Sequence, residues 1–241
     1  MKRILPYILS CILLVYLIIV FTFVTTKLGE VKCIGVQVAV KEADVNMFVD
    51  EEDIMKAIKR GYGDIINKSI VTVNKDSLEK VLVKNPMLKS AQVYYSLDGY
   101  IHVNILQREP VLRVMTGEGY YVDCDGKVMP LSSRFTSRVL VATGDINKKF
   151  ACEKLYPFTM KLKSDPFWNA YIEQLIVKSN GDVVMIPKVG DFKIMLGPVE
   201  HSDMRLEKLV LFLKDGIAKK GWIRYKEINL KFENQIVCVR K

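Results

Sequence analysis

The pattern of apolar and polar positions separates one uninterrupted apolar segment from a long remainder of alternating and periodic segments. The first segment, residues 4–26, holds 23 residues without a charged side chain. A helix of that length spans about 34 Å, which exceeds the roughly 30 Å hydrocarbon core of a bilayer. The segment is longer than the apolar part of a secretory signal and has no small-residue cleavage site after it. We therefore predict a retained transmembrane helix over residues 4–26.

The charges that flank this segment predict its orientation. Lys2 and Arg3 precede it, so the positive-inside rule keeps residues 1–3 as a short cytoplasmic tail. Two lysines beyond the segment oppose this weakly, but long domains translocate largely regardless of charge. The sequence predicts a single-pass protein of the cytoplasmic (inner) membrane, with the domains after the helix in the periplasm.

Residues 33–108 change between strand and helix periodicities. The pattern predicts strands over 36–40, 91–97 and 101–105, one helix that begins at Asp50, and a second that begins near Asn74 or Asp76 and stops at Asn85-Pro86. Two helices packed on one face of a three-stranded sheet would bury the apolar positions of all five elements. This order of strand, helix, helix, strand and strand resembles that of a POTRA domain.

Residues 109–241 have the pattern of a β-rich domain with flanking helices. Predicted strands cover 120–122, 128–130, 140–144, 172–177, 183–186, 192–196, 228–232 and 235–239, and predicted helices begin at Asp165 and Asp203, the second closing before Gly221. Asp98-Gly99 and Asn180-Gly181 indicate type I′ hairpin turns. The fold class is therefore predicted as α+β: an N-terminal transmembrane helix, a POTRA domain (β-α-α-β-β) and a mixed β-rich domain.

Charge and cysteine content narrow the classes of partner. The formal net charge is +9, which suits anionic lipid, an anionic cell-wall polymer or an acidic partner, although scattered basic residues are usually just a solvated surface. Nucleic acid is excluded by the predicted location. Cys33, Cys124, Cys152 and Cys238 follow the apolar segment without a C-x-x-C pair, so neither a zinc site nor a redox motif fits. They either pair as disulfides or act as small buried hydrophobes, and the second interpretation fits better.

Motifs for catalysis or metal binding are incomplete. Ser77 and Lys80 match S-x-x-K, but the S-D-N and K-T-G elements of penicillin-binding enzymes do not occur. The run 123–126 begins like a calcium loop but lacks the remaining ligands. His102 and His201 have no second ligand at helical spacing. We expect no catalytic residue, no cofactor, no metal and no small-molecule substrate.

Four further motifs together point to a known family. They are Asn85-Pro86-Met87-Leu88-Lys89-Ser90-Ala91, Gln107-Arg108-Glu109-Pro110, the run over residues 121–132, and Phe135-Thr136-Ser137-Arg138-Val139-Leu140. Over its whole length the chain resembles the FtsQ/DivIB family of bacterial cell-division proteins, in a Bacteroidetes-like form. The short tail 1–3 departs from many members. The resemblance implies a transmembrane helix at 4–26, a POTRA domain at 33–108 and a β-rich domain at 109–241.

The resemblance also implies a function. Members of this family are non-enzymatic scaffolds of the divisome that link early and late division proteins at the septum. They bind the single-pass proteins FtsB and FtsL by strand addition at the C-terminal edge, and upstream proteins such as FtsK through the POTRA domain. The assembly regulates septal peptidoglycan synthesis by FtsW and FtsI. Residues 4–26 would hold the chain in the lipid bilayer.

The partner-binding strand of the family can be placed on this sequence. It falls on Asn229, Leu230, Lys231, Phe232 and Asn234, and continues through Val237, Val239 and Arg240. A last strand at a chain end is often an edge strand, whose unpaired N–H and C=O groups can pair with another chain. The alternative is that these residues only complete the sheet and that Phe232 belongs to the core.

Two other classes of protein compete with the scaffold. A membrane-tethered periplasmic enzyme that binds or modifies the cell wall would suit the location and positive charge, but it needs a catalytic constellation. An outer-membrane assembly factor with a POTRA domain needs a C-terminal barrel of many alternating strands, which residues 109–241 cannot supply.

Overall fold

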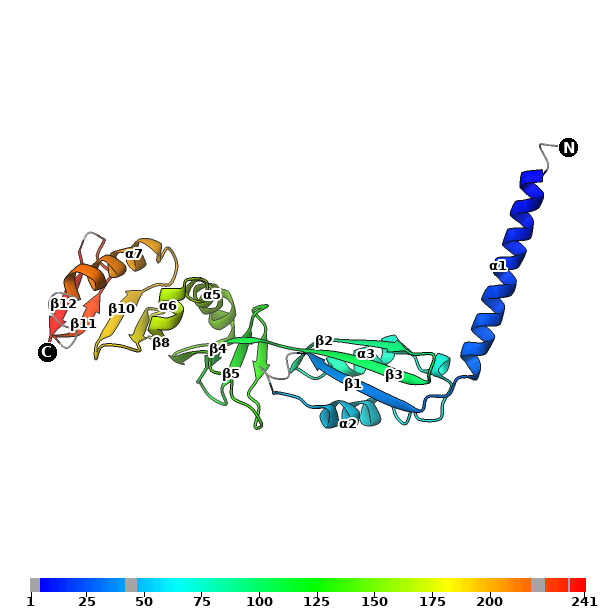
Figure 1. Cartoon of the computed structure of the whole chain (residues 1–241). Coiled ribbons are helices and arrows are strands. Elements are labelled where there is room, and N and C mark those ends of the chain that lie inside the picture. The colour runs from blue at the N-terminus through cyan, green and yellow to red at the C-terminus, as the bar shows by residue number, and fades with distance from the viewer. Residues whose placement is uncertain (1–4, 42–46, 218–223, 234) are drawn as a thin grey trace. The chain divides into compact units, whose positions relative to one another are not determined.

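The chain folds into two compact units, Met1–Gln107 and Arg108–Lys241, each of which mixes helices and strands (Figure 1). The computed structural model describes residues 5–41, 47–217, 224–233 and 235–241. The predicted α+β class is confirmed. The predicted cytoplasmic tail, residues 1–3, lies outside the described residues.

The first element is the helix α1 (Leu5–Glu30), which is 26 residues long. Its large apolar side chains between Leu9 and Phe23 are exposed to solvent in the isolated chain. A search of the residues that the structure describes finds no helix both long enough and apolar enough to cross a membrane. The transmembrane helix predicted at 4–26 is thus not found in the described part of the chain.

The rest of the first unit is a three-stranded sheet with two helices. Its elements are β1 (Gly35–Lys41), α2 (Glu51–Gly61), the 3₁₀ turn η1 (Ile70–Thr72), α3 (Lys75–Val83), β2 (Leu88–Tyr95) and β3 (Tyr100–Gln107). The strand order is β1-β3-β2, with β1 parallel and β2 antiparallel to the central β3. The predicted β-α-α-β-β order is confirmed, with η1 as an addition.

Side-chain caps fix where both helices begin. Asp50 precedes α2 and accepts the N–H of Asp53 at 2.9 Å, while the Asp53 carboxylate accepts the N–H of Asp50 at 3.3 Å. This capping box satisfies two N–H groups that the first helical turn leaves without partners. Asn74, rather than Asp76, caps α3 by accepting the N–H of Ser77 at 2.9 Å.

A buried glutamine closes the core of the first unit. The core joins Ile54 and Leu82 of the two helices to Ile101 and the other inward residues of β3. Gln107 is only 4% exposed, and its Oε1 accepts the N–H groups of Phe48 and Val49, each at 3.0 Å. This side chain ties the segment that leads into α2 to the end of the central strand.

Replacing Gln107 with alanine is therefore expected to destabilise the first unit by about 2–4 kcal/mol, because two backbone N–H groups lose their buried acceptor. Urea unfolding of the full chain, followed by far-ultraviolet circular dichroism, measures the loss. Gln92→Ala, on the exposed side of β2, serves as the control and should leave the transition in place. Equal midpoints for the two variants would contradict the role of Gln107.

The second unit is built on one nine-stranded sheet. Its strands are β4 (Pro110–Val114), β5 (Tyr120–Asp123), β6 (Val128–Pro130), β7 (Leu140–Gly144), β8 (Ile172–Val177), β9 (Val183–Pro187), β10 (Lys193–Gly197), β11 (Tyr225–Asn229) and β12 (Val237–Arg240). Their order in the sheet is β12-β11-β10-β9-β8-β7-β4-β5-β6. The pairs β10–β11, β4–β7 and β7–β8 are parallel, and the others are antiparallel.

Helices pack on this sheet and supply much of its core (Figure 1). They are α4 (Lys148–Phe150), η2 (Ala151–Leu155), α5 (Tyr156–Ser164), α6 (Pro166–Tyr171), α7 (Asp203–Leu211) and η3 (Phe212–Ile217), of which η2 and η3 are π-helical. Buried Phe158, Trp168 and Leu209 lie in one cluster with Leu175 and Ile194 of the strands. The predicted end of the last helix, before Gly221, lies outside the described residues.

Three hairpins share one loop geometry. In each loop the first residue donates its N–H to the carbonyl oxygen of the fifth at 2.9 Å, and the fourth residue is a glycine with positive φ; the loops are Ser96–Tyr100, Asp123–Lys127 and Lys178–Asp182. The predicted type I′ turns are wrong, because they require positive φ at both central residues. Among described residues other than glycine, only Asn67 and His201 have positive φ. Glycine takes the left-handed position that completes the hairpin.

Two elements of the second unit differ from the sequence pattern. The strand β4 was not predicted; it begins directly after the motif Gln107-Arg108-Glu109-Pro110, with Pro110 as its first residue, where a missing N–H is tolerated. The helical segment 148–164 was not predicted; it contains Pro157, which lies in the first turn of α5, where proline is tolerated. The π-helical turn η2 lies directly before it, and such turns change the hydrogen-bond pattern of a helix locally.

Candidate partner-binding edge

The last strand of the chain forms one end of the nine-stranded sheet. Among the described strands, β12 pairs with β11 alone, whereas β11 pairs with β10 on its other side. The expected binding segment Asn229–Asn234 is therefore not an edge strand. Asn229 ends the interior strand β11, the residues after it form a turn, and Asn234 lies outside the described residues. Of the predicted residues, those of β12 provide the open edge.

The register shows which backbone groups of β12 face outward. Val237 pairs with Asn229 and Val239 with Glu227, and the N–H of Lys241 donates to the carbonyl oxygen of Arg224 at 3.2 Å. Because successive residues of a strand point their N–H groups to opposite sides, residues 237, 239 and 241 face β11. The N–H and C=O groups of Cys238 and Arg240 face the open edge.

The side chains of β12 alternate between the core and solvent. Ile236 and Cys238 pack against the core of the second unit. Val237 and Val239 are 38% and 48% exposed, and Arg240 is exposed as well. Exposed β-branched side chains beside unpaired backbone groups are what an added strand needs for both affinity and register.

Two predicted binding residues in the segment before β12, Leu230 and Phe232, differ in their exposure. Leu230 is fully buried and belongs to the core, so its side chain is not exposed to a partner. Phe232 is 46% exposed and lies outside the core, which removes the core alternative for this side chain. The Nζ of Lys208 on α7 donates to the carbonyl oxygens of Phe232 and Glu233, each at 2.7 Å. This lysine holds the turn against α7.

A second lysine anchors the same turn. The Asp182 carboxylate accepts a hydrogen bond from Lys231 Nζ at 2.8 Å and another from the side-chain amide of Asn180 at 3.1 Å. The bond from Lys231 holds the pKa of Asp182 below its ordinary value. A lowered folded-state pKa means that the pair stabilises the fold above about pH 4 and loses this contribution only as the pH falls further. Sequence reasoning missed Lys208 and Asp182, because their partners are distant in the chain.

The cysteines are not bridged. All five are free, with Cys33 buried, Cys11 exposed and the others half-buried. Burial raises the pKa of the Cys238 thiol, so this side chain at the edge is neutral at physiological pH. The prediction that the cysteines act as small buried hydrophobic side chains therefore holds for Cys33, and partly for Cys124, Cys152 and Cys238, which are only half-buried.

The motifs that resemble catalytic or metal sites have structural roles. Ser77 and Lys80 are both exposed on α3. The Asp123 carboxylate accepts the N–H groups of Asp125 and Lys127 at 3.0 and 2.7 Å and pairs with Arg108 at 2.6 Å, so it closes its own hairpin. Within the described ranges, no group of three or more His, Cys, Asp or Glu side chains could hold a metal ion.

For the cell-division role that the sequence resemblance implies, replacing Ser77 with alanine is expected to leave division intact, because the Ser77 side chain is exposed and the cap on α3 uses only its backbone N–H. Complementation of a depleted strain, scored by septum counts under the microscope, measures this. A division block in a strain that expresses Ser77→Ala at the normal level would instead indicate a chemical role for the hydroxyl.

Together, the two units define a protein with a POTRA-like module and a β-rich domain that ends in an open strand. Comparison with family models agrees: a model for a POTRA-like domain matches residues 31–106, and a model described as FtsQ/DivIB, C-terminal related, matches residues 109–239. The chain belongs to the FtsQ/DivIB family. Domains of this family suggest a scaffold role in cell division and are typically non-enzymatic. A search of curated proteins finds no match.

Proposed function

We propose that this protein is a non-enzymatic scaffold of the divisome that binds FtsB- and FtsL-like single-pass proteins by strand addition at β12. The observation that carries the proposal is the open edge of β12 in a chain of the FtsQ/DivIB family. Outward N–H and C=O groups would supply generic affinity, and the exposed Val237, Val239 and Phe232 would select the partner. Binding there would regulate septal peptidoglycan synthesis by the partner enzymes.

The anchored turn supports this proposal energetically. Ordering an interface segment that is mobile before binding costs free energy, which weakens the association. Lys208 and Lys231 already hold the turn that carries Phe232. The exposed ring therefore projects from a preorganised segment, so less ordering free energy is lost when a partner binds.

The POTRA-like unit would bind upstream division proteins such as FtsK. The sheet of this unit also ends in two edge strands, β1 and β2. Upstream division proteins bound there would be linked through this chain to the late ones held at β12. A chain that lacks residues 31–106 should then retain FtsB-like partners and lose upstream ones in the same pull-down.

We also propose that the protein works at the cytoplasmic membrane, with both folded units in the periplasm. The exposed apolar side chains of α1 and the charge-free run 4–26 support attachment to the bilayer there. A reporter that is active only in the periplasm, fused after Lys241, should be active in dividing cells. Activity of a cytoplasm-only reporter at that position would place the domains on the other side.

A pull-down from dividing cells tests the scaffold proposal. The tagged full-length chain should co-purify FtsB- and FtsL-like proteins, and a chain that stops after Glu233, and so lacks β12, should lose them. Depletion of the protein should give filaments that fail to form septa. Retention of these partners at full yield by a folded chain without β12 would overturn strand addition as the mode of binding.

A further inference from the structure

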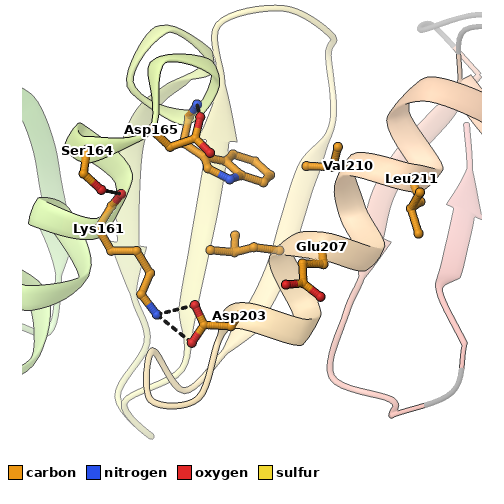
Figure 2. Close-up of a pocket in the computed structure, with 9 residues that line it drawn as sticks. Lys161, Ser164, Asp165, Asp203, Glu207, Val210 and Leu211 are labelled. Atoms are coloured by element: carbon orange, nitrogen blue, oxygen red, sulfur yellow. Dashed lines mark hydrogen bonds and ion pairs between the residues drawn. The ribbon is translucent and has the colours of Figure 1, made fainter.

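A groove lies between the helices of the second unit. It has a volume of about 520 Å³ and is lined by residues of α5, α6 and α7 and by Asp165, the N-cap of α6. The residues from the helices are Lys161, Ser164, Trp168, Asp203, Leu206, Glu207, Val210 and Leu211. Figure 2 shows Glu207, Val210 and Leu211 along one side, on α7, with Lys161 and Ser164 on the other. None of these residues belongs to β12 or to the turn before it.

The floor of the groove is apolar. Trp168 and Leu206 are 5% and 4% exposed and belong to the core, and Val210 packs against that core. Leu211 stands at the rim with 62% of its surface exposed. An exposed leucine beside an apolar floor offers a contact surface for the apolar side chains of another chain.

The rim of the groove is acidic, in contrast to the chain as a whole. Three carboxylates line it against one cation, whereas the full chain has a formal charge of +9. The single cation, Lys161, is bound to both oxygens of Asp203 at 2.8 Å (Figure 2). This bond holds the pKa of Asp203 below its ordinary value, so the pair stays ionised and neutral overall. Glu207 and Asp165 supply the remaining negative charge.

The walls of the groove determine the backbone conformation of an occupant. Leu206, Glu207 and Val210 lie within α7, where the backbone groups are paired inside the helix, whereas Ser164 and Asp203 lie at helix ends. Along α7 an extended chain would lose water from its own N–H and C=O groups without gaining partners, whereas a helix brings its backbone hydrogen bonds with it. The geometry therefore favours a helix in a groove over an added strand.

We propose that this groove is a second docking site, which binds an amphipathic helix of a partner protein with apolar side chains on one face and lysine or arginine beside them. The proposal goes beyond strand addition at β12 and does not depend on it, because the two surfaces share no residue. Charge complementarity selects a basic helix: its cations would meet Glu207 and Asp165 while its apolar face covers Leu211 and the floor.

Binding of a designed peptide to the full-length chain tests this site. The probe is a labelled helical peptide of about 20 residues, long enough to be helical in isolation, with leucines on one face and lysines beside them. A matched peptide carries glutamates in place of the lysines. The chain is held in phosphatidylcholine nanodiscs, and empty nanodiscs correct for partition into lipid. We expect the lysine peptide to bind at least about tenfold more tightly than the glutamate peptide.

Substitutions in the groove locate the binding. Glu207→Lys should weaken binding of the lysine peptide by about tenfold and strengthen binding of the glutamate peptide. Glu173→Lys, on the exposed side of β8, makes the same charge change elsewhere and should leave both affinities unchanged. Leu211→Ala should weaken binding, and Met204→Ala should not, although Met204 is 69% exposed on the same helix. All four positions are exposed, so the variants should fold, which circular dichroism checks.

Several results would overturn the proposal. These are no binding of the lysine peptide, equal binding of both peptides, or equal effects of the groove and control substitutions. Concentration-dependent self-association that Leu211→Ala abolishes would show instead that a second copy of the chain covers the groove. Loss of FtsB-like partners in a β12 variant would leave peptide binding unchanged, so failure of strand addition and failure of this site are distinguishable.

Discussion

Replacing Cys238 with proline is expected to weaken binding of the proposed FtsB-like partner by at least about tenfold while the second unit stays folded. The N–H of Cys238 faces the open edge of β12 rather than β11. Proline removes this donor and puts a ring where the added strand would lie, and edge strands tolerate proline where the N–H faces solvent. Co-purification from dividing cells measures the binding, and urea unfolding measures the fold.

Two further substitutions control this result. Cys238→Ala keeps the outward N–H and should bind the partner normally. Val237→Pro removes an N–H that faces β11, so it should detach β12 and lower the stability of the second unit as well as the binding. Full-affinity binding by Cys238→Pro would contradict strand addition at this edge, and equal loss of stability in both proline variants would contradict the inferred direction of the N–H groups.

The second large effect is expected at Asp123, whose replacement by alanine should destabilise the second unit by roughly 3 kcal/mol. The Asp123 side chain is 1% exposed and its partner Arg108 is 16% exposed. Alanine leaves this arginine without its carboxylate and two backbone N–H groups without their acceptor. The sequence has no tryptophan before residue 108, and Trp168 is buried in the core of the second unit, so tryptophan fluorescence during urea unfolding reports that unit.

Asp123→Asn provides the matched comparison. Asparagine keeps one oxygen that can accept the N–H groups of the hairpin, but it presents no charge to Arg108. Its loss of stability should therefore be smaller than that of Asp123→Ala. If the alanine variant unfolds at the same urea concentration as the original chain, the hairpin does not depend on this carboxylate.

Local chemistry explains why much of the fold was predictable from the sequence. Asp50, Asn74 and Asp165 each cap a helix through N–H groups two or three residues further on. Such bonds depend only on neighbouring residues, so the pattern of a capping side chain before an apolar period is enough to predict them. Most strands were predicted for the same reason, because their period of two is a local property. β4 was missed, and the strand predicted over 228–232 is β11, Tyr225–Asn229.

Conflicts between local signals explain what the sequence pattern missed. Pro157 lies within one helical segment after a π-helical turn, although proline ordinarily ends a helix. The turns at Asp98-Gly99 and Asn180-Gly181 were placed correctly, but their type was wrong. The glycine takes the left-handed position of a longer loop instead of the second position of a two-residue turn.

The sequence by itself determined the order of elements, the POTRA-like arrangement and the family, because these depend on local periodicity and on motifs read along the chain. Only the tertiary structure decided which strand is an edge. That choice depends on pairing between distant segments, such as β11 beside β10. It placed Leu230 in the core, left Phe232 exposed and turned the backbone groups of Cys238 and Arg240 toward the open edge. The clamp of Lys208 on the turn and the groove beside Trp168 arise in the same way, because their groups meet only after the chain has folded.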